Sequence, residues 1–548
     1  MAAPRQMEGT SVGKRAINKT LPALLLALAA LLQGCLRESV PDAVPAEPYT
    51  PATTADIYDD DVSAPDRRGV FTLRYDPNST LNPISGMNSD NILLSSLLYE
   101  GLFSLDSNLA AEPVLCESWT VEDNLIYTLN IKPDVAVNDG STLTANDVVY
   151  TLTQASQRGL FVNRLKNVEK ITSDGELSVI INLKSPNRHF INLLDIPIIK
   201  SGSMDNRMPP GTGPYVFSES DIMRLDRFRS HRDYESLPVY SIFLRVCNDD
   251  EAAEFFEDGK LSLLWDDPSD TYDIRLNRVH EKRFYDTTTL QFIGYNTRSV
   301  VLREPDVRRA VGCAIDREFI VSDIMQGSAL VAENALSPAY RYYSEQWNYT
   351  TIDPQLEISA ILDWAGLEDF DDDSYLEYPD GAGNYVKFSF DFIVNSENQY
   401  KVRAAHLIAG ALRQTGISVT VRELPWDSFI GALESGNFDM YYGEVMLSAD
   451  FDLSSLLLPN GKLNYGKVGG SDYRPYMDAF LNAETEGDEI LAAKELCEIV
   501  LWESPFSPIL YKKYAVYTPM GAISGAMPGQ SGVFRMIKDW TIDLSMIF

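Results

Sequence analysis

Apolar and polar residues alternate, or recur with a helical period, through most of the chain. Residues 70–75, 126–132 and 177–184 place an apolar side chain at every second position, which predicts half-buried β-strands. Residues 401–414 gather apolar side chains on one helical face, and alternation returns over residues 417–424 after a glycine. The order strand, helix, strand with short turns is typical of a mainly parallel sheet. The pattern therefore predicts an α/β fold.

The N-terminal part of the chain has a different pattern. Residues 1–20 are basic, and an uncharged, mostly apolar run follows from Leu21 to Cys35. Its apolar part is shorter than the ~20 residues that a permanent membrane-spanning helix needs. A basic start before a short apolar run is typical of a secretory signal peptide, so we predict one over residues 1–34. Residues 35–68 contain five prolines and an acidic run without apolar periodicity, which predicts a flexible tether.

The overall composition limits the possible classes of function. The chain has 548 residues, of which 45% are hydrophobic and 23% are charged, as in soluble globular proteins. Its formal net charge of −33 repels nucleic-acid phosphates, so we expect no nucleic-acid partner. Five cysteines in a chain of this length indicate neither a disulfide framework nor a zinc-ribbon array. We expect the four cysteines after Cys35 to be small buried hydrophobic residues, although an extracytoplasmic disulfide stays open.

No common catalytic motif is complete. The chain contains no phosphate-binding G-x-x-x-x-G-K-[ST] loop and no G-x-S-x-G nucleophile turn. Residues 211–216 (GTGPYV) contain two glycines of a dinucleotide fingerprint but lack the third. The four histidines are isolated from one another in the sequence, at His189, His231, His280 and His406. We therefore predict a protein that is not an enzyme, with no catalytic residue, no cofactor and no metal.

One acidic segment partly matches a calcium-binding loop. Asp369, Asp371 and Asp373 occupy odd positions of that loop, and Glu377 and Asp380 lie where later ligands would fall. However, the sixth position is serine rather than glycine, and the twelfth is aspartate rather than glutamate. The sequence therefore favours a solvated acidic loop over a calcium site.

Six further segments carry a family resemblance. Residues 81–152 contain an Asn-Pro, a Tyr-Glu-Gly-Leu, a Pro-x-Leu-x-Glu-x-Trp and an Asp-Gly-x-x-Leu-Thr-Ala-x-Asp-Val. This run resembles the opening of the extracellular solute-binding proteins of the peptide/nickel type (family 5). The remaining matches follow in the family's order, at residues 211–217, 293–321, 424–445, 471–484 and 504–517. None of these motifs is decisive by itself, but their order along the chain makes the resemblance specific.

The resemblance implies a fold and a division into domains. Family members have a two-lobed, periplasmic-binding-protein-like fold (type II) with an inserted subdomain and a hinged ligand cleft. Here lobe I would comprise residues 69–85, 203–288 and 512–548, the inserted subdomain residues 86–202, and lobe II residues 289–511. A ligand that contacts both lobes would shift the equilibrium between open and closed forms, and no bond would be made or broken.

The resemblance also implies a role and partners. The protein would be the substrate-binding lipoprotein of an ABC importer, which captures peptides or peptide-like amines and delivers them to a membrane permease. The sequence Leu32-Gln33-Gly34-Cys35 resembles a lipobox, so Cys35 would carry a lipid that anchors an extracytoplasmic monomer to the cell membrane. The alternatives are a peptide-sensing receptor lipoprotein and the binding of a non-peptide ligand such as an oligosaccharide.

Residues for ligand binding follow from the same resemblance. Peptide-binding members pair an extended ligand with main-chain groups of the cleft and bind its α-ammonium with an aspartate. That aspartate corresponds to Asp450, with Asp452 as the fallback, and the main chain of Met446 and Ser448 would pair with the ligand. The alternative for Asp450 is a helix N-cap.

Two segments would form the opposite wall of the cleft. The loop that contains Gly86, Met87 and Asn88 matches a segment that contributes main-chain hydrogen bonds in the family. Trp265 and Asp267 would lie at the cleft edge of lobe I, where Trp265 either stacks on the ligand or fills the core.

Glu444 departs from the family pattern. Some oligopeptide-binding members have an arginine at this position, six residues before the aspartate, to neutralise a ligand carboxylate. A glutamate there either favours a cationic or amine-bearing ligand or shares a proton with Asp450. The alternative is that Glu444 faces away, or pairs with a lysine or arginine outside the cleft.

Overall fold

The computed structural model describes residues 69–218, 222–269, 274–348, 354–380, 382–469 and 473–547. These residues all belong to one compact unit of the chain. The predicted signal peptide (1–34), the predicted tether (35–68) and Cys35 lie outside the described residues.

Two four-stranded sheets lie in the first half of the chain. One has the order β1 (Phe71–Arg74), β10 (Ser241–Arg245), β9 (Arg224–Arg227), β8 (Tyr215–Ser218), in which β1 and β10 are parallel and the other pairs are antiparallel. The other is wholly antiparallel, with the order β4 (Cys116–Glu122), β5 (Ile126–Ile131), β7 (Ser178–Leu183), β6 (Val168–Ser173). The strands predicted over 70–75, 126–132 and 177–184 are thereby confirmed as β1, β5 and β7.

These two sheets share one hydrophobic core. Helices α2 (Ser89–Leu98) and α3 (Ala145–Gln157), the hairpin β2 (Phe103–Leu105)–β3 (Ala111–Pro113) and the C-terminal segment contribute to it. The C-terminal segment includes the hairpin β20 (Ile523–Ser524)–β21 (Thr541–Ile542). The predicted lobe I and the predicted inserted subdomain are therefore continuous in their packing.

A seven-stranded mixed sheet organises the rest of the chain. Its order is β11 (Leu264–Asp266), β19 (Phe506–Pro519), β12 (His280–Tyr295), β18 (Met440–Met446), β16 (Ser389–Asn395), β17 (Ser418–Leu424), with β13 (Ala329–Val331) also paired to β19. The predicted helix and following strand are confirmed as α8 (Gln399–Gln414) and β17. The prediction of a mainly parallel sheet holds only for β17, β16 and β18, because the long strands β12 and β19 run antiparallel.

The remaining elements surround this sheet. Most are helices, and one is a small hairpin. They are α4 (Asp249–Glu257), α5 (Pro305–Cys313), α6 (Arg317–Phe319), α7 (Pro354–Trp364), α9 (Trp426–Ser435), α10 (Ser454–Leu457), α11 (Arg474–Leu481), α12 (Glu486–Glu503) and the hairpin β14 (Glu377–Pro379)–β15 (Tyr385–Lys387).

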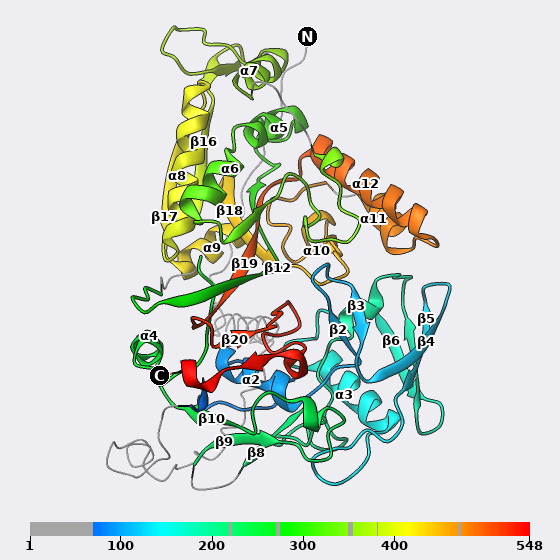
Figure 1. Ribbon diagram of the computed structural model, residues 1–548. Helices are drawn as coiled ribbons and strands as arrows, with labels where there is room; N and C mark the ends of the chain where they lie inside the picture. Colours follow the sequence, from blue (N-terminus) through cyan, green and yellow to red (C-terminus); the bar gives the residue numbers. More distant parts are fainter. Residues whose placement is uncertain are drawn as a thin grey trace, which may run out of the picture. The chain divides into compact units, whose positions relative to one another are not determined.

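Strands β12 and β19 run through both groups of elements (Figure 1). Their residues 290–294 and 506–511 pair within the cores of the second half of the chain, whereas residues 280–286 and 513–519 pair beside the first core. The register of the pairing shifts between the two stretches, between Asp286 and Leu290 of β12. The passage between cores thus lies beside the predicted boundaries 288/289 and 511/512, which stay predictions.

Two glycines allow aromatic side chains to lie flat across β12 and β18. Gly294 pairs with Tyr441, and Gly443 pairs with Phe292. A Cβ atom at Gly294 would come within 2.1 Å of the Tyr441 ring, and one at Gly443 within 2.5 Å of the Phe292 ring. Because such contacts are shorter than any van der Waals distance, these positions require glycine.

We predict that Gly294→Ala lowers the free energy of unfolding by about 2 kcal/mol, since the methyl group overpacks a filled core. Gly431→Ala is the matched control, because Gly431 lies exposed in α9 with no atom within 4 Å of the added Cβ. Alanine favours a helix over glycine, so the control should gain up to about 1 kcal/mol. Urea denaturation of both variants checks this, and equal stabilities would contradict the close packing.

Candidate functional site

Part of one edge of β18 lacks a partner strand. β18 is antiparallel to β12, and the N–H of Leu447 donates to the Thr288 carbonyl of that strand at 3.0 Å. Main-chain groups of successive residues point to opposite sides of a strand, so those of Glu444 and Met446 point away from β12. On that side β16 pairs with β18 only at Met440 and Tyr441. Within the described ranges, no other strand pairs with this edge.

The unpaired part of β18 is open to solvent. Glu444 and Met446 are both exposed, and Met446 retains 57% of its accessible surface. Unpaired main-chain donors and acceptors on a strand edge are the groups with which an extended chain pairs. The edge of β18 at Glu444 and Met446 is therefore a candidate site for main-chain hydrogen bonding.

A charged cluster lies beside this edge. One carboxylate oxygen of Glu444 contacts three donors, namely Gln291 Nε2 at 2.7 Å, Lys401 Nζ at 3.1 Å and Lys512 Nζ at 3.4 Å. Lys512, which is almost fully buried, also donates to Asp267. Two lysines and two carboxylates thus balance in charge where β11, β12, β18 and β19 meet.

The cluster decides between the alternatives for Glu444. Burial alone would raise the pKa of Glu444, but Lys401, Lys512 and the hydrogen bond from Gln291 hold it below its usual value. An ionised, twice-paired glutamate needs no proton shared with Asp450. Glu444 thus pairs with two lysines, and whether this pairing lies outside the cleft stays a prediction.

Trp265 belongs to the packing below the cluster. Its side chain packs against the first core, its Nε1 donates to the hydroxyl of Tyr285, and its ring meets the edge of Tyr514 at 5.4 Å. Of the two roles predicted for Trp265, the core contact is the one seen here. Asp267 is held by Lys512 and by the hydroxyl of Ser269 at 2.9 Å.

Asp450 lies in the turn that follows β18 and is 4% exposed. Its carboxylate accepts bonds from the Ser448 hydroxyl (2.5 Å) and from Asn187 Nδ2 (2.9 Å). Burial, together with the charge of Asp452, raises the pKa of Asp450. The main chain of Ser454, where α10 begins, donates to Asp452 rather than to Asp450. The helix N-cap interpretation of Asp450 is therefore wrong.

The predicted opposite wall has a well-defined main chain. Gly86 is buried, its N–H donates to the Asn82 carbonyl at 2.8 Å, and a Cβ atom would lie 2.9 Å from that oxygen. Asn88 is the N-cap of α2, and its side chain also contacts Asp76. Met87 is 77% exposed, so among the three predicted residues it alone has a largely solvent-exposed side chain.

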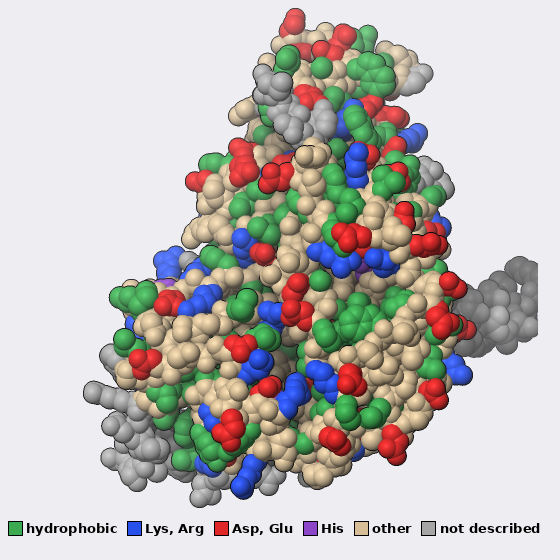
Figure 2. Space-filling view, turned by 45° about the vertical axis from the view of Figure 1, so that its right-hand side comes forward, with side chains coloured by type: hydrophobic (Ala, Val, Ile, Leu, Met, Phe, Trp, Pro, Cys, Tyr) green, Lys and Arg blue, Asp and Glu red, His purple; other side chains and the backbone are tan. Residues whose placement is uncertain are grey.

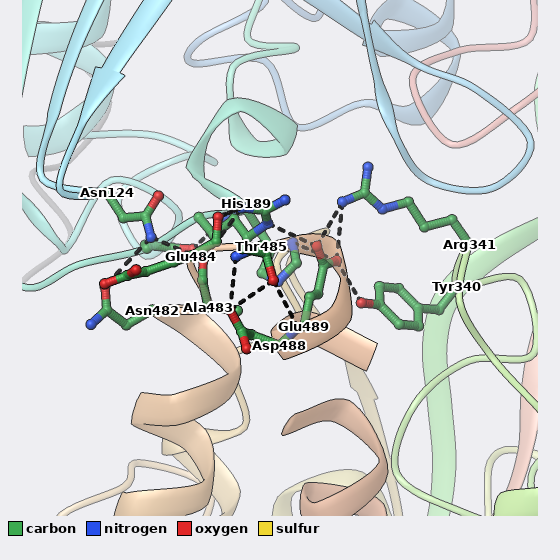
Figure 3. Close-up of polar contacts among 12 residues, drawn as sticks. Asn124, His189, Tyr340, Arg341, Asn482, Ala483, Glu484, Thr485, Asp488 and Glu489 are labelled. Atoms are coloured by element: carbon green, nitrogen blue, oxygen red, sulfur yellow. Dashed lines mark hydrogen bonds and ion pairs between the residues drawn. The ribbon is translucent and has the colours of Figure 1, made fainter. Parts of the chain in front are cut away.

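A second group of contacts joins the predicted inserted subdomain to the predicted lobe II (Figure 3). Three consecutive residues, Asn187, Arg188 and His189, carry it, and we refer to them as the 187–189 segment. Asn187 donates to Asp450, Arg188 donates to Glu489 at 2.8 Å, and His189 stacks on Phe480 with ring centroids 4.7 Å apart.

Polar contacts continue on both sides of the segment. Asn124 Nδ2 donates to the Ala483 carbonyl at 3.1 Å, and Asn192 Nδ2 to the Ala449 carbonyl at 3.4 Å. The ammonium group of Lys166 lies 2.8 Å from the carboxylate of Asp452. The segment is thus the centre of a continuous interface.

Sequence reasoning missed the 187–189 segment. Its polar residues follow a strand and precede an apolar run, as in any surface turn, and we read His189 as an isolated histidine. Its carboxylate partner, Glu489, lies 301 residues away from Arg188 in the chain. No local pattern signals such a pairing.

Donor groups of the protein itself contact the carboxylates of the acidic loop (residues 369–377). The carboxylates of Asp369, Asp371, Asp373 and Glu377 lie within 4.8 Å of one another. Lys387 Nζ lies 3.1 Å from Asp373, and main-chain N–H groups of the loop donate to Asp369 and Asp373. These donors each contact a carboxylate of the loop, and the preference for a solvated loop over a calcium site stays a prediction.

A cavity of about 1290 Å³ lies away from the predicted site residues. It is lined by residues of α5, α6 and α8 and by the start of β19, including Cys313, Arg317, Leu407 and Phe506. None of the predicted ligand-binding residues lines it.

Charged side chains on one face of the molecule are interspersed. Figure 2 shows Lys and Arg next to Asp and Glu across this face, in keeping with the many ion pairs between them.

No helix in the described part of the chain is both long and apolar enough to cross a membrane.

Comparison with known proteins defines the class to which this site belongs. Residues 110–466 match the family model described as bacterial extracellular solute-binding proteins, family 5 Middle. The chain belongs to this family, and the predicted resemblance is confirmed. It is therefore a solute-binding protein of the ABC-transporter type, with the two-lobed α/β fold (type II) that the resemblance implied.

Individual relatives differ in their ligands. The chain is 27% identical over 390 residues to the oligopeptide-binding protein AppA of Bacillus subtilis (strain 168), covering 63% of this chain and 67% of the relative. It is 24% identical over 467 residues to the glutathione-binding protein GsiB of Escherichia coli (strain K12), covering 79% and 87%. The structure of NikZ from Campylobacter jejuni in complex with Ni(L-His) superposes with a TM-score of 0.64 at 18% identity, covering 87% and 100%.

We predict that Lys512→Met lowers the free energy of unfolding by about 3 kcal/mol, because Asp267 is left buried without its partner. Lys513→Met is the control, since Lys513 makes one long contact of 3.8 Å to Asp286 and should cost at most about 1 kcal/mol. Urea denaturation measures the free energy of unfolding of both variants. Equal losses would show that the buried Lys512–Asp267 pair stabilises the protein no more than the long contact of Lys513 does.

The pH dependence of stability tests the environment of His189. Burial, with the charges of Arg341 and Arg188, outweighs Glu489 and lowers the pKa of His189 to about 4. In the unfolded chain the imidazole is protonated below about pH 6.5, so its contribution to stability is present above that pH and is lost as the pH falls towards 4.

His189→Gln should therefore lose about 2 kcal/mol less stability than the wild type between pH 7 and pH 4.5. His406→Gln, at an exposed histidine that contacts Glu423, should behave like the wild type. Urea denaturation at the two pH values gives the comparison. If His189→Gln loses as much stability as the wild type, His189 is not held neutral.

Proposed function

We propose that the protein captures peptides, or amine-bearing peptide-like ligands, between its two lobes and delivers them to an ABC permease, without catalysing a reaction. The observation that carries the proposal is the open edge of β18 at Glu444 and Met446, which is followed directly by the turn that contains Asp450. The ligands named for AppA and GsiB, an oligopeptide and glutathione, support a peptide-like ligand.

The ligand would bind as an added strand. Its main chain would pair with the outward N–H and C=O groups of Glu444 and Met446 and, beyond the strand, with Ser448. Since these are main-chain bonds, they would hold peptides of many sequences. The side chains of Trp265 and Asp267 would form the floor beside the edge, and residues 86–88 would supply main-chain groups from the opposite wall.

The ligand amine would bind to Asp450. An ammonium group against a carboxylate makes short, charge-assisted hydrogen bonds, roughly twice as strong as neutral ones. In the conformation described here Asn187 covers Asp450, so the amine reaches the carboxylate only after the 187–189 segment moves. The charge of the ammonium would also reverse the rise that burial causes in the pKa of Asp450.

The remaining parts of the proposal concern domains and location. Lobe I would comprise residues 69–85, 203–288 and 512–548, the inserted subdomain residues 86–202 and lobe II residues 289–511. The protein would be a monomer held at the outer face of the cell membrane by a lipid on Cys35, after removal of the signal peptide.

We predict that Asp450→Asn weakens binding of free-amine peptides by about 2–4 kcal/mol, because a charged partner is lost. A library of free-amine tri- to pentapeptides and the same library N-acetylated serve as ligands, and calorimetry measures both. The wild type should prefer the free amines, and the variant should lose that preference.

Asp427→Asn is the matched control, since Asp427 is exposed in the first turn of α9 and should bind as the wild type does. Equal affinity of the wild type for free and acetylated peptides would contradict amine capture by Asp450. Absence of binding to either library would contradict a peptide ligand altogether.

A further inference from the structure

We propose that the 187–189 segment closes the inserted subdomain onto lobe II when no ligand is bound, with Glu489 as the residue that anchors the contact. This goes beyond the proposed function, because the contact is made entirely by the protein's own residues.

Glu489 has the contacts of a buried anchor. It lies in the first turn of α12, is fully buried, and accepts bonds from Arg188 Nε (2.8 Å), Arg341 Nη2 (2.9 and 3.0 Å) and the Tyr340 hydroxyl (2.7 Å). Burial alone would raise the pKa of Glu489, but the hydrogen bond from Tyr340 and the charge of Arg341 hold it below its usual value. One partner comes from the inserted subdomain and the others from lobe II, so the carboxylate is fully satisfied only when the two are in contact.

Arg188 joins two helix ends of lobe II. Its main-chain N–H donates to the Leu481 carbonyl at 2.6 Å, and its guanidinium donates to the carbonyls of Ala483 (3.3 Å) and Glu484 (2.8 Å). Leu481 is the last residue of α11 and the other two carbonyls follow it, so the guanidinium lies near a helix C-terminus, where a cation is favourable. Glu489 lies at the start of α12. Figure 3 shows residues 482–485, which connect the two helices, and Glu489 of α12 beside His189.

The interface also has an apolar part. Leu109, in the loop between β2 and β3, is 3% exposed. It packs in a hydrophobic core of lobe II rather than in the core of its own subdomain. Its φ of 61° is unfavourable for leucine, so this backbone position costs free energy that the burial must offset. On the other side, His189 stacks on Phe480.

The segment also controls access to the ligand site. Asn187 donates to Asp450, and its neighbour Arg188 donates to Glu489. Breaking the contact at Glu489 would therefore release the cover over Asp450 as well. The unliganded protein would alternate between a closed form, in which Asp450 is satisfied by Asn187, and an open form that admits a ligand.

Hydrogen–deuterium exchange of the unliganded full chain tests the proposal, because the amide of residue 188 donates across the interface. The variants are Glu489→Gln, which keeps the shape of the anchor, and Arg188→Ala, which removes the guanidinium but leaves the amide. Arg158→Ala is the matched control, since Arg158 pairs with Asp205 at the surface and does not reach lobe II. The amides of β5 report on the intact fold.

At pH 7 we expect slow exchange at residue 188 in the wild type and in Arg158→Ala, and at least tenfold faster exchange in the other two variants. The amides of β5 should be unchanged in all four proteins. Fast exchange at residue 188 in the wild type, or unchanged exchange in both test variants, would overturn the proposal. Equal acceleration at β5 and residue 188 in both variants would also overturn it, because the contact would then open only with the whole fold. No ligand is used, so the result is independent of whether peptides bind.

Discussion

The antiparallel pairing of β12 with β19 is the constraint on which the rest of the structure depends. These strands leave the cores of the second half of the chain and continue beside the first core, so they connect the body built on the first core with the body built on the cores of the second half. The buried ammonium of Lys512 lies at this passage and joins Asp267 of the first body to Glu444 of the second. A buried charge of this kind is stable only with its partners in place. We infer that a ligand between the lobes would lie beside this strand pair and its charges.

The open edge of β18 follows from the same architecture. β16 ends its pairing at Tyr441, while β18 continues along β12 to Met446. An exposed strand edge is an aggregation risk that soluble proteins normally cover or keep short. Here it is limited to a few residues and bordered by charged side chains. We interpret it as an edge kept free for a ligand, with the inserted subdomain able to close over its far end at Asp450.

Sequence patterns predicted the elements better than the contacts between them. Strands β5, β7 and β17 and helix α8 follow from local periodicity, because each buries one face. The antiparallel course of β12 and β19 could not be read in this way, since their pairing joins residues more than 200 positions apart. The same holds for the site. The family motif suggests Asp450 as a ligand residue, which stays a prediction, but its cover by Asn187 and the pairing of Glu444 with two lysines depend on residues distant in the chain. The helix N-cap alternative failed because Asp452, two residues later, takes the bond from the start of α10.

A crystal structure of the protein with a bound free-amine peptide tests the central claim most directly. The account predicts a peptide whose main chain is hydrogen-bonded to the N–H and C=O groups of Glu444 and Met446, with its ammonium group against the carboxylate of Asp450. A peptide bound elsewhere, such as in the cavity beside Cys313 and Leu407, with the edge of β18 still unpaired, would contradict it.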